Sequence, residues 1–191
     1  MGIGTVLFYG VFVLLLVYGI FVYNQLVSLK HNVSMAWANI DVLLKQRHDE
    51  LPKLVETCKQ YMKFEQDTLE KVMLARAQVA SARESRDVPG LGQAENALKS
   101  GLGKLFAVAE SYPDLKSDET FMHLQGRISG LENAIADRRE FYNDSVNINN
   151  VRIEQFPDSF VASLFKFGPF PLLRFSQSEK ADVDLQQMFK A

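Results

Sequence analysis

The sequence predicts an all-α fold in which an N-terminal transmembrane helix continues into an antiparallel bundle of long helices. Residues 1–29 contain no Lys, Arg, Asp or Glu, whereas charged residues are frequent in the rest of the chain. From Leu26 onward, apolar residues recur every three or four positions, which is the period of an amphipathic helix. No segment alternates apolar and polar residues as a half-buried strand does. The chain is therefore expected to contain helices only.

The first element is expected to be an uncleaved membrane anchor. The run "IGTVLFYGVFVLLLVYGIFVY" supplies the roughly 20 apolar residues that a bilayer-spanning helix requires. A cleaved signal peptide has a basic start and a small-x-small exit, and neither is present here. Lys30, Lys45 and Arg47 follow the span and no basic side chain precedes it. The positive-inside rule then predicts that the N-terminus lies outside and the body of the protein in the cytoplasm.

The rest of the chain divides into three helical stretches. Apolar residues with helical spacing run from Leu26 to about residue 82, from Leu91 to Ala109 and from Phe121 to Ile153, where the last helix ends before "FPDSF". Pro89 and Gly90 separate the first two stretches, and Pro113 separates the next two. Either Ser117 or Asp118 can cap the last helix. We expect residues 1–29 to form the anchor and juxtamembrane segment, 30–157 the bundle and 158–191 an apolar, aromatic tail.

The sequence allows two conformations of the chain at Pro52. Apolar residues keep the same helical spacing before and after the proline, which favours one long kinked helix. At 1.5 Å per residue, this helix would extend about 80 to 90 Å from the bilayer to residue 82. A reversal of the chain at Pro52 would instead give a compact four-helix bundle.

The stretch "KQRHDELPKLVE" looks at first like a metal or acid–base site. Three consecutive helical residues point about 100° apart, so His48, Asp49 and Glu50 cannot converge on one ion. We interpret this run as the polar, exposed part of a helix, with Pro52 in its first turn or at a kink. The sequence has no nucleophile elbow, phosphate-binding loop or Cys–His signature, and its one cysteine, Cys58, lies at an apolar helical position. We therefore expect no enzymatic activity, no cofactor and no metal.

The charge balance argues against nucleic acid as a partner. The 21 Lys and Arg residues face 23 Asp and Glu residues, for a net charge of -2, and no run of five like charges occurs. A protein that binds nucleic acid needs a basic face to neutralise phosphates.

Two sets of residues are candidates for interaction. Charged residues that fall in or beside the apolar stripes either pair within the bundle or face another subunit, and these are Glu65, Arg76, Arg138 and Arg139. The second set is aromatic and consists of Trp37 together with the tail residues Phe160, Phe165, Phe167, Phe170 and Phe175. The tail "FVASLFKFGPFPLLRF" suits a lipid headgroup boundary or a subunit contact, or it folds back over the end of the bundle.

The chain resembles the LemA family along nearly its whole length. The residues that carry the resemblance are Tyr23-Asn24 after the anchor, "LVSLKHNVSMAWANIDVLLKQR", "LPKLVETCKQY", "YPDLKSDETFMHLQ", "LENAIADRREFYND" and Phe156-Pro157. Ile148 departs from the pattern, because the family usually has a second tyrosine before Asn149. The resemblance implies a bacterial, single-pass inner-membrane protein with a helical bundle, related to proteins linked to magnetosome formation and found beside a membrane metalloprotease. It implies no known enzymatic activity.

Two functions fit these features. The first is a non-enzymatic scaffold that self-associates as a homo-oligomer and organises components of the inner membrane. The second is a membrane adaptor that recruits a client or a membrane protease in envelope stress or signalling. A loss of self-association on deletion of the tail would indicate the scaffold, and a loss of a foreign partner would indicate the adaptor.

Overall fold

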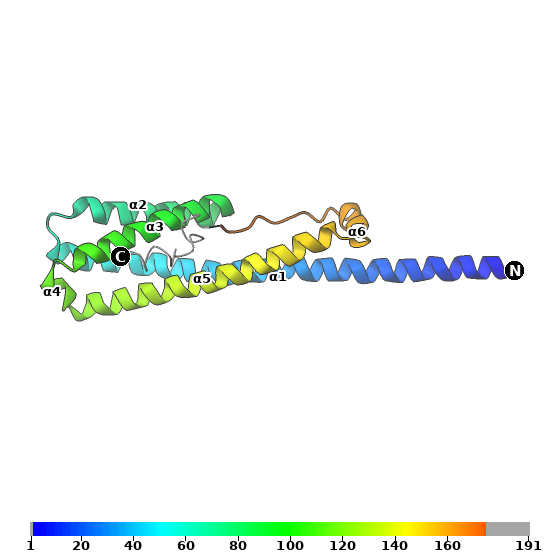
Figure 1. Cartoon of the computed structure of the whole chain (residues 1–191), viewed down its shortest axis with the longest axis horizontal. Helices are drawn as coiled ribbons and strands as arrows, with labels where there is room; N and C mark the ends of the chain where they lie inside the picture. The colour runs from blue at the N-terminus through cyan, green and yellow to red at the C-terminus, as the bar shows by residue number, and fades with distance from the viewer. Residues whose placement is uncertain (1, 175–191) are drawn as a thin grey trace, which may run out of the picture. The chain divides into compact units, whose positions relative to one another are not determined.

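The computed structural model describes residues 2–174, and every regular element in this range is a helix, so the all-α prediction is confirmed. The helices are labelled in Figure 1 and are α1 (Ile3–Tyr61), α2 (Gln66–Ser85), α3 (Val88–Ala109), α4 (Pro113–Lys116), α5 (Glu119–Glu154) and α6 (Asp158–Leu164). The chain forms two compact units, each of which contains part of α1 and part of α5. The first unit holds residues up to 39 together with 140–172, and the second holds residues 40–139 together with Leu173 and Arg174.

Helix α1 is continuous over 59 residues and passes through Pro52. The chain therefore does not reverse at the proline. The large apolar side chains from Ile3 to Phe21 are exposed around the whole helix, and by length and composition this helix is able to cross a membrane. From Val22 onward only one face of α1 is buried. The anchor and the first bundle helix are thus one element whose surface changes character near Val22.

The prediction that one helix runs from the anchor to about residue 82 is wrong, because α1 ends at Tyr61 and α2 begins at Gln66. The turn between them contains no Gly or Pro, and Met62 is buried on one side of it while Phe64 is exposed. Met62, Glu65 and Leu69 keep the three-and-four spacing across the turn, so periodicity could not reveal it. Glu65 is the N-cap residue of α2, and its carbonyl accepts the N–H groups of Thr68 and Leu69.

In the second unit, four helical segments pack as an antiparallel bundle. Helix α2 returns along α1, since Arg83 lies 3.6 Å from Asp41 and Arg76 reaches His48 further along. Helices α2 and α3 lie side by side (Figure 1), and a Cβ on Gly101 would lie 3.3 Å from a methyl carbon of Val72. The start of α5 lies on the end of α1 through the Tyr61–Asp118 hydrogen bond of 3.1 Å. The predicted antiparallel bundle is confirmed.

Local signals set the helix ends in this unit. Arg86 adopts a left-handed conformation with φ 54° and closes α2. Asp87 caps α3 by accepting the N–H of Gly90 at 3.0 Å, and Pro89 occupies the first turn. Of the two cap candidates for the last helix, Asp118 caps α5, because its carboxylate accepts the N–H of Phe121 at 2.8 Å.

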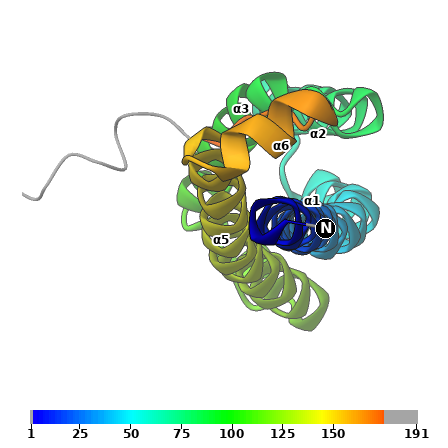
Figure 2. The ribbon, with the colours of Figure 1, turned by 90° about the vertical axis from the view of Figure 1, so that its right-hand side faces the viewer.

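In the first unit, the described part of the tail folds back on α1 and α5. Figure 2 shows α6 following directly on the end of α5 and taking a different direction. Ala162 of α6 is buried with Val22 and Leu26 of α1. Further along, the backbone N–H and carbonyl of Phe170 both bond the side chain of Asn150 at 2.9 Å. Residues 158–172 therefore pack on their own chain, against α1 and α5 of the first unit, whereas contact of the tail with lipid or with another subunit stays a prediction.

The last described residues belong to the second unit. Leu173 is buried there, and a Cβ on Gly92 would clash with the backbone carbonyl oxygen of Arg174. Only glycine lets α3 approach the chain so closely at this point.

Candidate functional site

The predicted interaction residues on the bundle occupy different environments. Trp37 is half-buried and packs edge-on against Tyr142, with ring centroids 5.7 Å apart. Arg76 is half-buried and is used within its own bundle. Arg138 is exposed, and Arg139 is half-buried at the edge of a cavity of about 130 Å³. The structure does not bring this set together as one site, and the role of each residue in interaction stays a prediction.

The predicted tail residues are partly covered. The Phe160 side chain is 72% exposed and Phe165 is 55% exposed, whereas Phe167 and Phe170 are half-buried. Phe175 lies outside the residues that the structure describes. Residues 158–172 therefore fold onto their own unit and still present aromatic surface.

An aromatic cluster joins the end of the apolar segment to the tail. The rings of Tyr23 and Phe165 lie 4.7 Å apart, and those of Tyr23 and Phe167 lie 5.8 Å apart. A cavity of about 350 Å³ opens beside this cluster, and the side chains of Lys30 and Lys166 line it. Aromatic and basic side chains are typical of the zone where a membrane helix leaves the bilayer.

Helix α5 carries a second apolar stripe on its outer face, which we call the outer stripe and define as Phe141, Ile148 and Val151. Their side chains are exposed by 52%, 56% and 44%, whereas the inner face of the same turns is buried through Tyr142 and Val146. Sequence reasoning listed only the inner face. The signal was present, because these residues are separated by seven and three positions, which places them along one side of a helix.

Helix α1 presents an exposed face at about the same level, with a small residue at each of its two ends. This face, which we call the α1 face, consists of Ser28, His31, Met35 and Ala38, all of them exposed. Because Trp37 packs on Tyr142, Ala38 lies close to the level of Phe141. Because Gln25 accepts a hydrogen bond from Arg152 at 2.8 Å, Ser28 lies close to the level of Val151.

The second unit contains a buried charge cluster that sequence reasoning missed. Arg47 of α1 forms an ion pair with Glu95 of α3, and both side chains are almost completely buried. Glu132 of α5 lies 3.9 Å from Arg47, and burial raises the pKa of its carboxyl even though the positive charge of Arg47 opposes this shift. Arg47 follows Leu44 by three residues and precedes Leu51 by four, which is the spacing of one helix face, whereas no sequence signal identifies Glu95 on α3 as its partner. The cluster links three helices of the bundle.

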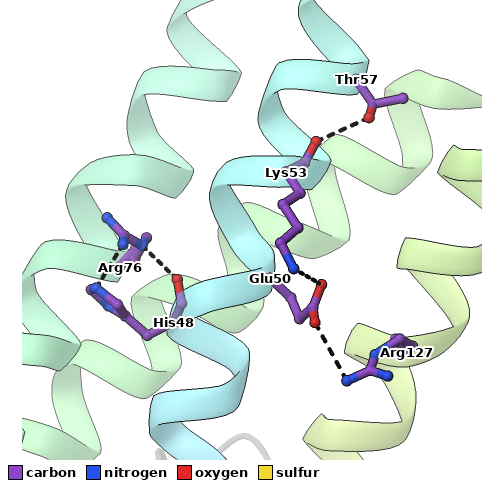
Figure 3. Close-up of polar contacts among 6 residues, drawn as sticks. All are labelled: His48, Glu50, Lys53, Thr57, Arg76 and Arg127. Atoms are coloured by element: carbon purple, nitrogen blue, oxygen red, sulfur yellow. Dashed lines mark hydrogen bonds and ion pairs between the residues drawn. The ribbon is translucent and has the colours of Figure 1, made fainter.

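His48, the residue that suggested a metal site, instead belongs to a contact that compensates for Pro52 (Figure 3). Proline has no N–H, so the His48 carbonyl four residues earlier lacks its helical donor. The Arg76 Nε–H donates to this carbonyl at 2.9 Å, and Arg76 Nη2 donates to His48 Nε2 at 2.6 Å. An acceptor at Nε2 requires neutral imidazole with its proton on Nδ1, and that Nδ1 is buried without a hydrogen-bond partner among residues 2–174.

This contact predicts a pH dependence of stability. Burial, and then the charge of Arg76, lowers the pKa of His48 below its ordinary value of 6.5. Between the lowered pKa and about 6.5, the unfolded chain binds a proton that the folded chain does not. Neutral His48 therefore makes its full contribution to the free energy of unfolding above about pH 6.5, and this contribution is lost as the pH falls below that value. We expect the melting temperature of the full chain to drop less between pH 7.5 and 5.0 in His48→Gln than in the unchanged chain.

The matched control is His123→Gln, because His123 is exposed on α5. This variant should show the same pH-dependent drop as the unchanged chain. An equal drop in His48→Gln and His123→Gln would contradict the assignment to His48.

The remaining groups of chemical interest are the metal-ligating side chains and the thiol of Cys58. No group of three or more His, Cys, Asp or Glu side chains in residues 2–174 is arranged to hold a metal ion. Cys58 is fully buried, and this burial raises the pKa of its thiol to about 12, so little thiolate forms near neutral pH.

Comparison with known proteins gives consistent matches. A model of the LemA family matches residues 36–186. The chain is 25% identical to Protein LemA of Metamycoplasma hominis over 97% of this chain and 86% of the relative. It is 23% identical to Magnetosome protein MamQ 2 of Paramagnetospirillum magneticum over 76% of this chain, and the match spans 62% of that relative's length. A third relative, Magnetosome protein MamQ of Magnetospirillum gryphiswaldense, is 32% identical over 39% of this chain and 27% of its own length.

Proposed function

This chain belongs to the LemA family, and we propose that it is a membrane-anchored, non-enzymatic scaffold that self-associates and organises components of a bacterial inner membrane. The outer stripe of α5 is the observation that carries the proposal, because it is an exposed apolar helix face that residues 2–174 leave uncovered. The MamQ relatives are magnetosome proteins, which is in line with a role in assembly at a membrane.

The packing at the end of the apolar segment supports an anchor that is retained. Helix α1 is unbroken from Ile3 onward, and Val22 and Leu26 pack against Ala162 of α6. Cleavage near the end of the apolar segment would remove part of this small core. We propose that the helix spans the inner membrane once, with the N-terminus outside and the bundle in the cytoplasm.

The outer stripe is suited to contact with another protein surface. Single exposed apolar side chains are common, but three that lie along one side of one helix form an apolar patch, here with Asp144 between the first two. Contact with a partner would remove the apolar surface of Phe141, Ile148 and Val151 from water. Burial of apolar surface stabilises a contact by about 25 cal/mol per Å². A membrane anchor favours such a contact further, because it confines all copies to one plane, at one height and in one orientation.

We propose that the occupant of the outer stripe is a second copy of this chain, and specifically its α1 face. Asp144 lies between Phe141 and Ile148 on the outer side of α5. If two outer stripes met in the same orientation, Asp144 would face Asp144, and such like-charge pairs are destabilising. The α1 face instead offers small residues at the matching levels, with Ala38 near Phe141 and Ser28 near Val151. Contact between two different faces, repeated about an axis normal to the membrane, closes a ring.

Substitution of the outer stripe tests the proposal. We expect Phe141→Ser/Ile148→Ser to abolish self-association of the full chain in mild detergent, because it removes most of the apolar surface that would be buried. Both side chains are exposed, so the melting temperature should change little. The measurement is the protein mass from light scattering after detergent subtraction, over a range of concentrations.

The matched control is Leu74→Ser/Met122→Ser, which makes the same kind of change at exposed apolar positions in the second unit. This variant should keep the mass of the unchanged chain. A monomeric unchanged chain at every concentration would refute the scaffold and would direct attention to an adaptor that needs a foreign partner. Equal loss of mass in both variants would show that the outer stripe has no special role.

A further inference from the structure

We propose that the cavity beside the Tyr23–Phe165–Phe167 cluster binds the headgroup of an anionic phospholipid, with Lys30 and Lys166 holding the phosphate. The inference rests on the membrane anchoring proposed above and does not depend on self-association.

The cavity has the size and the lining for such a group. Its volume is about 350 Å³, and it lies between α1 and the segment that follows α6. Tyr23, Phe165 and Phe167 provide an apolar aromatic wall, and Lys30, Lys166 and the buried Asn149 provide polar contacts. A lipid presents the same two chemistries, since the charged phosphate is attached to an apolar glycerol ester region.

The charge of the cavity is positive. Neither Lys30 nor Lys166 forms an ion pair within the part of the chain that the structure describes, and no Asp or Glu lines the cavity. His31 also lines it. Elsewhere in this unit, the buried carboxylate of Asp158 is already paired with Arg152, so the two lysines are available to an anion.

The position of the cavity along α1 matches the headgroup layer. At 1.5 Å per residue, the apolar segment up to Val22 covers the roughly 30 Å of the hydrocarbon core. Tyr23 then lies at the boundary, and Lys30 lies about 10 Å further along the helix. Helical side chains lean toward the N-terminus, so the long Lys30 side chain extends back toward the bilayer. This arrangement places its ammonium group near the depth of the phosphates.

Lipid binding to the full chain tests the inference. The chain in mild non-ionic detergent is titrated with phosphatidylglycerol or with zwitterionic phosphatidylcholine, and the number of bound lipids is counted by native mass spectrometry. We expect one phosphatidylglycerol to bind more tightly than the others and more tightly than phosphatidylcholine. Each lysine near an anionic surface contributes about fivefold to affinity, so Lys30→Gln/Lys166→Gln should weaken this binding by about thirtyfold.

The control variant is Lys45→Gln/Lys104→Gln, which removes the same charge from exposed positions in the second unit and should leave the tight binding unchanged. Equal affinity for the two lipids, or equal loss in both variants, would overturn the inference. Displacement of the lipid by millimolar inorganic phosphate would also overturn it, because the site would then serve a free anion. A separate experiment, reconstitution of the full chain into phosphatidylglycerol vesicles, tests the anchor by itself. A chain that fails to insert into the vesicles refutes the anchor. A chain that inserts but shows no preference between the two lipids refutes only the headgroup site.

Discussion

Arg47→Met is expected to lower the free energy of unfolding by about 3–5 kcal/mol, which is the usual cost of removing one partner from a buried ion pair. The side chain of Arg47 is 3% exposed and that of its partner Glu95 is 6% exposed. Methionine has a similar length and fills much of the space, so the main loss is the positive charge. Glu95 would then be a buried carboxylate without its cation, close to Glu132. The measurement is urea unfolding of the full chain in mild detergent, followed by circular dichroism.

The exposed Arg127 provides the control for this prediction. Its side chain is 51% exposed and lies 3.4 Å from Glu50. Arg127→Met should cost less than about 1 kcal/mol, because solvent screens the charge of Arg127 and Lys53 still pairs with Glu50. We also expect Glu95→Gln to recover part of the loss when combined with Arg47→Met, since it removes the uncompensated charge. A cost for Arg47→Met no larger than that of Arg127→Met would show that the cluster does not hold the bundle together.

Arg152→Met is expected to destabilise the first unit by about 3 kcal/mol, the lower end of the range for a broken buried pair. Arg152 of α5 forms an ion pair with Asp158, the first residue of α6, whose side chain is only 3% exposed. It also donates to Gln25 of α1. The partner carboxylate would stay buried and unpaired, whereas Arg152 itself is 37% exposed, so solvent relieves part of the cost. The same urea titration provides the free energy, and cleavage of α6 by a protease should become faster.

The matched variant is Arg138→Met, because Arg138 is exposed on the same helix. It should change the unfolding free energy by less than about 0.5 kcal/mol and leave the protease sensitivity of α6 unchanged. Faster cleavage in both variants, or in neither, would mean that Arg152 does not fix α6 in place.

The sequence predicted most of the helices because their signals are local. Pro89, Pro113 and Asp118 act within a few residues of the helix ends that they mark. The turn at residues 62–65 had no such signal, and the apolar phase continued across it. Continuation through Pro52 was one of two open alternatives, and it depends on Arg76, which lies 28 residues away along the chain and supplies the missing donor.

The candidate sites were predicted less well because they depend on distant partners. Arg47 had the phase of a buried residue, yet only the packing of α3 against α1 identifies Glu95 as its counterion. The phenylalanines of the tail were recognised as a group, but their composition does not distinguish Phe167, which packs on Tyr23, from the exposed Phe160. The residues of the outer stripe also have helical spacing in the sequence. They do not stand out there, because the apolar residues of the buried face are sufficient to predict the helix.

These features fit together if the chain acts by holding copies of itself at a membrane. The buried charges then fix the geometry of the bundle, the pair of Arg152 and Asp158 fixes α6 beside the end of the anchor, and the exposed outer stripe and α1 face are the surfaces proposed for contact with a neighbouring copy. None of these roles needs a reacting group.

The most direct test is the mass of the full chain extracted from membranes together with its surrounding lipid, in polymer-bounded discs, beside the Phe141→Ser/Ile148→Ser variant. The scaffold account predicts that the unchanged chain forms closed, symmetric particles whose protein mass is a multiple of 21.6 kDa, and that the variant has the mass of one chain. A single chain in both samples would contradict the account.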